Sequence, residues 1–240
     1  MRLVCFIFVF LGLTQMAMAQ EISDDRIKKL AIEAILENPQ VIMEAVAILK
    51  KRESDQAASG TKSIRLQLES DPGSPNLGNI NGDVTVIEFF DYNCGYCRQA
   101  GKTIQALIAS DPNIRVIFRE WPVLGEGSTF AARAVLASAE QGKYEEFHWA
   151  LMNGKVRATK AGVMKIARDL GLDISKLEAD MVSSTVDGHL EKSNILAQNL
   201  GFTGTPAFIV GNQKVPGMIS FNQISELVAE TRATNLTLSD

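Results

Sequence analysis

Residues 86–101 read "VIEFFDYNCGYCRQAG", in which an apolar run leads directly into two cysteines separated by two residues. The full run, "VTVIEFF" at 84–90, is typical of a strand that is buried on both faces. Helical spacing follows Cys94 and ends at Asp111-Pro112, and "NIRVIFREW" at 113–121 predicts the next strand. The order strand, CxxC, helix, strand is the context of a redox-active cysteine pair.

The position of each cysteine predicts a different role. Cys94 is expected near the first turn of the predicted helix, where unpaired N–H groups and the helix dipole stabilise a thiolate. Cys97 follows one turn later on the same face, so it can attack the mixed disulfide that Cys94 forms with a substrate. We therefore interpret Cys94 and Cys97 as a redox disulfide, with Cys94 attacking and Cys97 resolving.

A cysteine pair with this spacing has three other possible uses. A structural disulfide would close so short a loop that it would add little stability. A zinc site needs four ligands, and His148 and His189 are distant, lack paired spacing and are expected at the surface or in caps. Two soft thiolates could instead bind Cu(I), which leaves a copper-handling protein as an open alternative. We expect no other metal and no cofactor.

Glu88 lies inside the apolar run, six residues before Cys94. Alternation along the strand places it on the same face as Val84, Val86 and Phe90, so its carboxyl group is expected to be buried. Burial without a charge partner raises the pKa of a carboxyl group, which suits proton exchange with the resolving thiol. A solvated acid at a strand edge is the alternative.

Residues 1–19, "MRLVCFIFVFLGLTQMAMA", have the pattern of a signal peptide that is cleaved after Ala19. Their apolar run is shorter than a membrane span requires. Cleavage would remove Arg2 and Cys5, so the formal net charge would pass from −4 to −5 and Cys94 and Cys97 would be the remaining cysteines. A mildly acidic exported chain is a poor candidate for binding nucleic acid.

Two amphipathic helices are predicted from Ser23 onward, with a break at Asn38-Pro39. The small polar stretch "SDQAASGTK" at 54–62 predicts a linker, and the alternation in "SIRLQL" at 63–68 predicts a strand. The apolar stripe of the two helices must be buried against the chain's own domain or against other copies of the chain. We favour self-association.

The remaining sequence predicts a long helical region and then two short strands and a closing helix. Amphipathic helices are predicted over 128–143, 144–155, 160–171 and 177–201, and the two strands flank a turn at Gly211-Asn212. The predicted fold is α/β, with a helical insertion inside the strand-containing domain and a helical stalk before it. The predicted division is a signal peptide at 1–19, a helical segment and linker at 20–55, an α/β domain at 56–124 and 196–240, and an insertion at 125–195.

Across about residues 62–235 the sequence resembles the DsbA family, the thioredoxin-fold disulfide oxidoreductases of the bacterial periplasm. The stretches "VIEFFDYNCGYC", "FREWPVLGEGS" and "GFTGTPAFIVG" carry this resemblance. It implies a thioredoxin fold, a periplasmic location, a nucleophilic Cys94, a resolving Cys97 and a buried acid at Glu88. It also implies a cis peptide bond at Thr205-Pro206, beside which a substrate peptide would bind, in contact with Gly95 and Tyr96.

Two departures from the strongly oxidising DsbA enzymes change the expected function. Those enzymes have Pro-His between the cysteines, whereas Gly95-Tyr96, as in the isomerase DsbC, lacks a cation that would stabilise the Cys94 thiolate. The segment "ILENPQVIMEAVAIL" at 35–49 resembles the oligomerising stalk of the ScsC-like subgroup. These features imply a homo-oligomer, joined through residues 21–53, that reduces or isomerises disulfides in misoxidised secreted proteins and is recharged by a membrane reductase. A monomeric oxidase with a membrane oxidase partner is the alternative.

Overall fold

The computed structural model describes residues 23–154 and 157–237, so the predicted signal peptide and its cleavage site lie outside the described residues. The chain divides into two compact units, one ending at Arg52 and the other beginning at Glu53. Within the described ranges, no helix is both long enough and apolar enough to cross a membrane.

The first unit contains helix α1 (Asp24–Glu37) and the beginning of helix α2 (Gln40–Glu69). Ser23 precedes α1 and Asn38-Pro39 separates the two helices, as the sequence predicted. The apolar side chains of this unit are exposed to solvent; the larger ones are Ile27, Leu30, Ile32, Ile35, Leu36, Val41, Ile42, Met43, Val46, Ile48 and Leu49. The apolar stripe has no partner within the described residues.

Helix α2 continues through both the predicted linker and the predicted strand, so these two predictions are wrong. In a strand, the alternating Ile64, Leu66 and Leu68 would share one face. In α2, Leu68 is buried and Ile64 packs beside it, four residues apart, while Leu66 is exposed. The small polar residues before them remain helical, and Thr61 donates a hydrogen bond of 2.9 Å to the carbonyl oxygen of Ala57.

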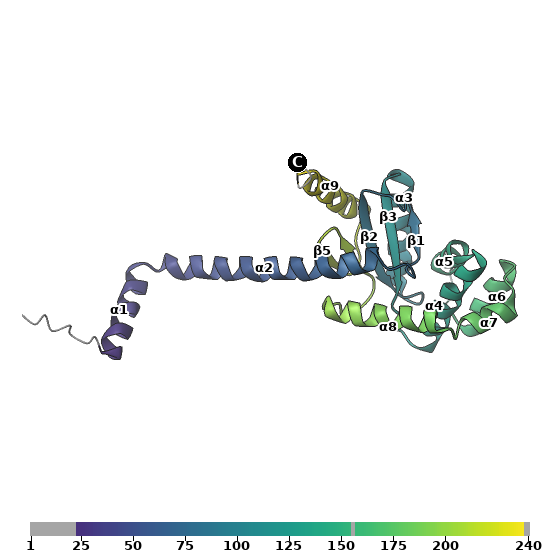
Figure 1. Cartoon of the computed structure of the whole chain (residues 1–240), viewed down its shortest axis with the longest axis horizontal. Coiled ribbons are helices and arrows are strands. Elements are labelled where there is room, and N and C mark those ends of the chain that lie inside the picture. The colour runs from purple at the N-terminus through teal and green to yellow at the C-terminus, as the bar shows by residue number, and fades with distance from the viewer. Residues whose placement is uncertain (1–22, 155–156, 238–240) are drawn as a thin grey trace, which may run out of the picture. The chain divides into compact units, whose positions relative to one another are not determined.

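The second unit is built on a five-stranded sheet with the order β1-β3-β2-β4-β5, of which Figure 1 labels β1, β3, β2 and β5. Strands β2 and β3 are parallel, and the other neighbouring strands are antiparallel. Helix α3 joins β2 to β3, and helix α9 follows β5, which is the predicted thioredoxin topology. The elements are β1 (Asn76–Gly78), β2 (Val84–Phe90), α3 (Gly95–Ser110), β3 (Ile114–Glu120), β4 (Ala207–Val210), β5 (Gln213–Pro216) and α9 (Phe221–Thr237).

The helical insertion lies between β3 and β4. It contains α4 (Glu126–Ser138), a 3₁₀ turn η1 (Ala139–Gln141), α5 (Tyr144–Met152), α6 (Lys160–Asp169), α7 (Ile174–Asp180) and α8 (Ser184–Asn199). The sequence predicted one helix over 177–201, but Ser183 starts a new helix there because its side chain accepts a hydrogen bond from the N–H of Val186. Helix α8 also runs across residue 195, where the insertion was predicted to end.

Each face of the sheet has its own hydrophobic core. On one face, Val84, Val86 and Phe90 pack with α3, α9 and the insertion, and this core includes Cys94 and Cys97. On the other face, Ile87 and Phe89 pack with α8 and with Leu68 at the end of α2. Strand β2 is therefore buried on both faces, as its continuous apolar sequence predicted.

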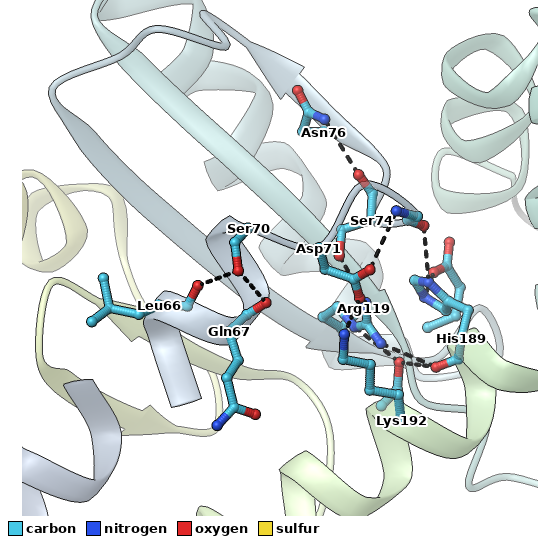
Figure 2. Close-up of polar contacts among 12 residues, drawn as sticks. Leu66, Gln67, Ser70, Asp71, Ser74, Asn76, Arg119, His189 and Lys192 are labelled. Carbon is cyan, nitrogen blue, oxygen red and sulfur yellow. Dashed lines mark hydrogen bonds and ion pairs between the residues drawn. The ribbon is translucent and has the colours of Figure 1, made fainter. Parts of the chain in front are cut away.

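A fully buried arginine connects the loop after α2 to β3 and α8 (Figure 2). Arg119 pairs with Asp71 at 3.0 Å and donates to Ser74 Oγ at 2.8 Å. It also donates to Ser193 Oγ at 3.1 Å and to the carbonyl oxygen of His189 at 3.1 Å. Because Arg119 is completely removed from solvent, these partners replace the hydration of its charge.

Candidate active site

Cys94 is the N-cap residue of α3, directly after the turn that follows β2. Its Sγ accepts a hydrogen bond from the N–H of Cys97 at 3.4 Å, and as a thiol it donates to the carbonyl oxygen of Thr205 at 3.3 Å. Both cysteines are free thiols, with Cys94 7% exposed and Cys97 0% exposed. The geometry therefore leaves Cys94 as the accessible thiol of the pair.

The two thiols have opposite acidities. Hydrogen bonding from the Cys97 thiol, supported by backbone N–H groups and by the Thr205 side chain, lowers the pKa of Cys94 to about 5 although burial opposes this. Burial raises the pKa of Cys97 far above its ordinary value, and the hydrogen bond to Cys94 and the nearby Glu88 charge add to the rise. At neutral pH, Cys94 is thus a thiolate and Cys97 a thiol.

Glu88 is fully buried on the β2 face that carries the cysteines. Neither of its carboxyl oxygens has a hydrogen-bond partner among the described residues. Burial raises the pKa of Glu88 to about 8, and the charge of Cys94 contributes to this rise. The structure therefore confirms the predicted burial of Glu88 and places a carboxyl group near neutral titration close to both thiols.

The remaining predicted site residues lie around Cys94. The peptide bond between Thr205 and Pro206 is cis, and the carbonyl oxygen of Thr205 lies 3.3 Å from the Cys94 sulfur. Gly95 is the first residue of α3, and the side chain of Tyr96 is 64% exposed beside it. The surface next to the acidic thiol thus combines an exposed aromatic ring with exposed main chain.

The two histidines are buried, so their predicted placement at the surface or in caps is wrong. His148 is fully buried; its Nδ1 lies 3.0 Å from the hydroxyl of Tyr92, and burial lowers its pKa to about 3. His189 Nε2 lies 2.7 Å from a carboxylate oxygen of the buried Glu120. Their partners come from elements distant in sequence, which local patterns do not reveal.

Sequence analysis also missed two polar residues in the turn before Cys94. Asp91 accepts hydrogen bonds from the N–H groups of Asn93 at 2.7 Å and of Val123 and Leu124 at 2.9 Å each. Asn93 pairs with main chain and side chain of the helical insertion. A short Asp-x-Asn stretch between a buried strand and a helix was the available signal, because these side chains close turns by bonding to nearby backbone.

Thiol–disulfide exchange requires an acidic thiol that attacks and a second thiol that resolves the mixed disulfide. The site has both, with a buried acid beside them. A family model for the DSBA-like thioredoxin domain matches residues 85–229. This chain belongs to the DsbA-like thioredoxin family. A second family model, for the copper resistance protein ScsC N-terminal domain, matches residues 25–56. The DsbA-like fold and the kinship to ScsC agree with the sequence resemblance.

Solved structures support this DsbA-like assignment. A thioredoxin-like oxidoreductase from Silicibacter pomeroyi DSS-3 is 53% identical, with 69% of this chain and 96% of that chain covered and a TM-score of 0.68. The thiol-disulfide exchange protein alpha-DsbA2 from Wolbachia pipientis is 28% identical, with 75% and 97% covered and a TM-score of 0.69. A curated relative, the Na(+)/H(+) antiporter NhaA 3 of Salinispora tropica, is 26% identical over 174 residues; 71% of this chain is covered, but the chain spans only 27% of that protein's length.

Proposed function

We propose that this thiol–disulfide oxidoreductase is exported to the periplasm, where it reduces or isomerises wrong disulfides in secreted proteins. The observation that carries the proposal is the pair of free thiols at the start of α3, with the acidic Cys94 toward solvent and the buried Cys97 behind it. Gly95 and Tyr96 between them bring no cation that would further stabilise the thiolate.

In the proposed reaction, the Cys94 thiolate attacks one sulfur of a substrate disulfide, and the other substrate sulfur leaves as a thiolate. Cys97 then gives its proton to the Glu88 carboxylate and attacks the Cys94 sulfur. This step forms the Cys94–Cys97 disulfide and releases the substrate as a second thiolate, so two electrons pass to the substrate. For isomerisation, the first substrate thiolate instead attacks a different substrate disulfide, and the thiolate released there attacks the substrate sulfur of the mixed disulfide. This second attack forms a new substrate disulfide and frees the Cys94 thiolate unchanged.

Glu88 supports the resolving step through its position and its pKa of about 8. The charge on Cys94 helps to hold this pKa up, so formation of the mixed disulfide, which removes that charge, makes the carboxylate form more accessible. A buried carboxylate close to Cys97 can then accept the proton whose loss is otherwise opposed by burial. The substrate chain would lie against Thr205-Pro206, Gly95 and Tyr96.

We propose that copies of the chain assemble through residues 21–53. The exposed apolar side chains of α1 and of the first part of α2 support this, because exposed stripes of this size are typical of interaction surfaces. Several thiol pairs in one assembly would suit repeated attack on one misfolded substrate. A membrane reductase would return Cys94 and Cys97 to the dithiol state.

Two alternatives remain, each with an observation in its favour. The low pKa of Cys94 stabilises the reduced form, which favours an oxidase that donates its disulfide to substrates. Cu(I) binding is favoured by two adjacent soft cysteine sulfurs, although the described residues contain no group of three or more metal-binding His, Cys, Asp or Glu side chains. A copper site would therefore rely on Cys94 and Cys97 alone or on ligands from other copies.

Equilibration of the mature protein with glutathione tests the direction of transfer. A potential well below that of the strong oxidants, together with recovery of a scrambled substrate, is the expected result; a potential as high as theirs would favour the oxidase. Tight Cu(I) binding combined with background exchange would replace the enzyme proposal altogether.

Light scattering tests the assembly in the full mature chain. Wild type should have a multiple of the monomer mass, and Ile42→Glu combined with Leu49→Glu should be a monomer, because charges are introduced into the apolar stripe. Glu44→Gln is the matched control on the same helix and should keep the wild-type mass. A monomeric wild type would end the assembly proposal without affecting the chemistry.

A further inference from the structure

Asn93, the residue directly before Cys94, connects the catalytic turn to the helical insertion. Its side-chain Oδ1 accepts a hydrogen bond of 2.7 Å from the N–H of Ala158, and its Nδ2 donates to the Ala158 carbonyl oxygen at 3.2 Å. The same Nδ2 also lies 3.1 Å from Ser128 Oγ in the first turn of α4. The Asn93 amide thus bonds to both the N–H and the C=O of Ala158, in the way that a residue of a neighbouring strand would.

Asn93 is half-buried, and its partners are more fully shielded from solvent. Ser128 is fully buried and Ala158 is 4% exposed, so their polar groups depend on protein partners. Ala158 lies two residues before α6, and Ser128 belongs to α4, so Asn93 contacts two separate segments of the insertion. Its hydrogen bonds therefore depend on the positions of both segments relative to the catalytic turn.

Gly127 is an independent sign that the fit between the turn and the insertion is tight. A Cβ atom at this position would lie 2.6 Å from the Ala158 carbonyl oxygen and 3.4 Å from Asn93 Nδ2. The first of these distances is too short for any side chain, so α4 approaches Ala158 as closely as a glycine allows. The amide of Asn93 fits into the space that this approach leaves.

The turn between β2 and α3 sets the position of the Cys94 sulfur. The N–H of Cys94 bonds to the Asp91 carbonyl oxygen at 3.0 Å, and Asp91 is held on its other side by the N–H groups of Val123 and Leu124. Asn93 is one link between this turn and the insertion, and the Tyr92 hydroxyl, 3.0 Å from His148 Nδ1 in α5, is another. The Cys94 sulfur receives the N–H of Cys97 at 3.4 Å, a separation at which a small displacement of the turn weakens the contact.

We propose that Asn93 is a positioning residue for the exchange reaction, through which the seating of the helical insertion sets how well the start of α3 stabilises the Cys94 thiolate. The inference rests on the proposed role of Cys94 as the attacking thiol. Loosening the contact from either side displaces Cys94 from the helix start. The thiolate is then less stable, and with it the reduced form, so the disulfide becomes a weaker oxidant.

The test perturbs the contact from both sides in the full mature protein. Asn93→Ala removes the amide on the side of the catalytic turn. Gly127→Ala acts from the side of the insertion, because the added methyl group pushes Ala158 away from Asn93. Both variants should raise the midpoint of Cys94 thiolate formation and raise the equilibrium constant for forming the Cys94–Cys97 disulfide from glutathione disulfide by roughly threefold to tenfold, where tenfold equals a potential about 30 mV lower. The double variant should show no more than the larger single effect, because both changes break one contact.

Two matched controls separate positioning from a general loss of structure. Asn79→Ala removes a half-buried asparagine, far from Cys94 in sequence, that bonds to the main chain of Pro112 and Asn81, and Gly188→Ala fills open space in α8. Both should keep the wild-type midpoint and equilibrium constant. If Asn93→Ala folds poorly, Ser128→Ala removes only one of the three hydrogen bonds and should shift both quantities in the same direction by less.

The inference is overturned if Asn93→Ala and Gly127→Ala keep wild-type thiolate midpoints and differ only in stability. It is also overturned if Asn93→Ala alone has an effect, because the influence would then be local to the residue beside Cys94. Failure of the proposed reaction is recognised separately, by wild-type protein in which Cys94 is not the thiol that titrates at low pH.

Discussion

The sulfur of Cys94 lies 3.3 Å from the carbonyl oxygen of Thr205, a residue 111 positions further along the chain. This contact joins the start of α3 to the entry of β4, so the two halves of the thioredoxin sheet meet at the reactive thiol. Thr205 also lowers the pKa of Cys94 through a side-chain hydrogen bond. The site is therefore completed by a residue that lies beyond the whole helical insertion.

Replacing Thr205 by valine keeps the backbone oxygen and removes the side-chain hydrogen bond to the Cys94 thiolate. The pKa of Cys94 should rise by roughly half a unit to one unit, the equivalent of about one ordinary hydrogen bond. Ultraviolet absorbance of the thiolate against pH measures the change. Thr203→Val, at an exposed position two residues earlier, should leave the titration unchanged.

The reactivity of the two cysteines should differ sharply with pH. Because the pKa of Cys94 is lowered to about 5, its alkylation should rise with pH up to about 6 and then level off as the thiolate saturates. Cys97 should stay unmodified through neutral pH because burial raises its pKa. Mass spectrometry of the labelled peptides assigns each site. Labelling of Cys97 first would contradict the assignment of Cys94 as the attacking thiol.

The lowered pKa of Cys94 also makes the stability of the reduced protein depend on pH. Its stabilising contribution should be fully present above pH 9, the ordinary pKa of a thiol, and should be lost as pH falls through about 5. Urea unfolding of the reduced protein and of Cys94→Ser at several pH values measures the difference. Equal pH dependence of the two proteins would contradict the acidic thiolate.

Glu88→Gln tests the buried acid through stability and through rate. The pKa of Glu88 is raised from 4.5 to about 8, so the protonated form is favoured in the folded protein, and this advantage is lost as pH rises through 8. As pH rises from 4.5 to 8, the unfolding free energy of the reduced wild type should therefore decrease relative to that of Glu88→Gln, by on the order of a few kcal/mol.

The same variant should slow release of the substrate from the mixed disulfide by on the order of a hundredfold, because glutamine cannot accept the Cys97 proton. Quenched-flow trapping of the mixed disulfide measures this rate. Wild-type rates in Glu88→Gln would remove Glu88 from the reaction even if the stability difference were observed.

Arg119→Ala should destabilise the domain by about 3–5 kcal/mol, because it empties a fully buried position and removes the donor to Ser74 Oγ and to the His189 carbonyl oxygen, while Asp71 keeps its ion pair with Lys192. Urea unfolding measures the loss. Lys165→Ala breaks the exposed ion pair with Asp169 and should cost less than about 0.5 kcal/mol. Similar losses in the two variants would show that the buried network contributes no more than a surface pair.

Several features follow from local sequence because local forces produce them. The continuous apolar run at 84–90 forms a strand that is buried on both faces, and Cys94 is the N-cap of the next helix. The predicted burial of Glu88 followed from alternation along one strand. Hydrophobic period and capping chemistry act between neighbouring residues, so they can be read from one sequence.

Other features depend on partners that the chain brings together only when it folds. "SIRLQL" at 63–68 alternates like a strand, but it is helical. In the helix Ile64 and Leu68 fall on the same side and pack against one face of the sheet. His148 and His189 are buried because Tyr92 and Glu120 lie inside the domain to receive them. Asn93 gains its role from Ala158, 65 residues away. The local pattern supplied the thiols, their helix and the Cys97 hydrogen bond that is the largest cause of the low Cys94 pKa. Long-range packing buried Cys97 and brought Glu88 and Thr205 beside the pair, because a pKa depends on every charge and hydrogen bond around the group.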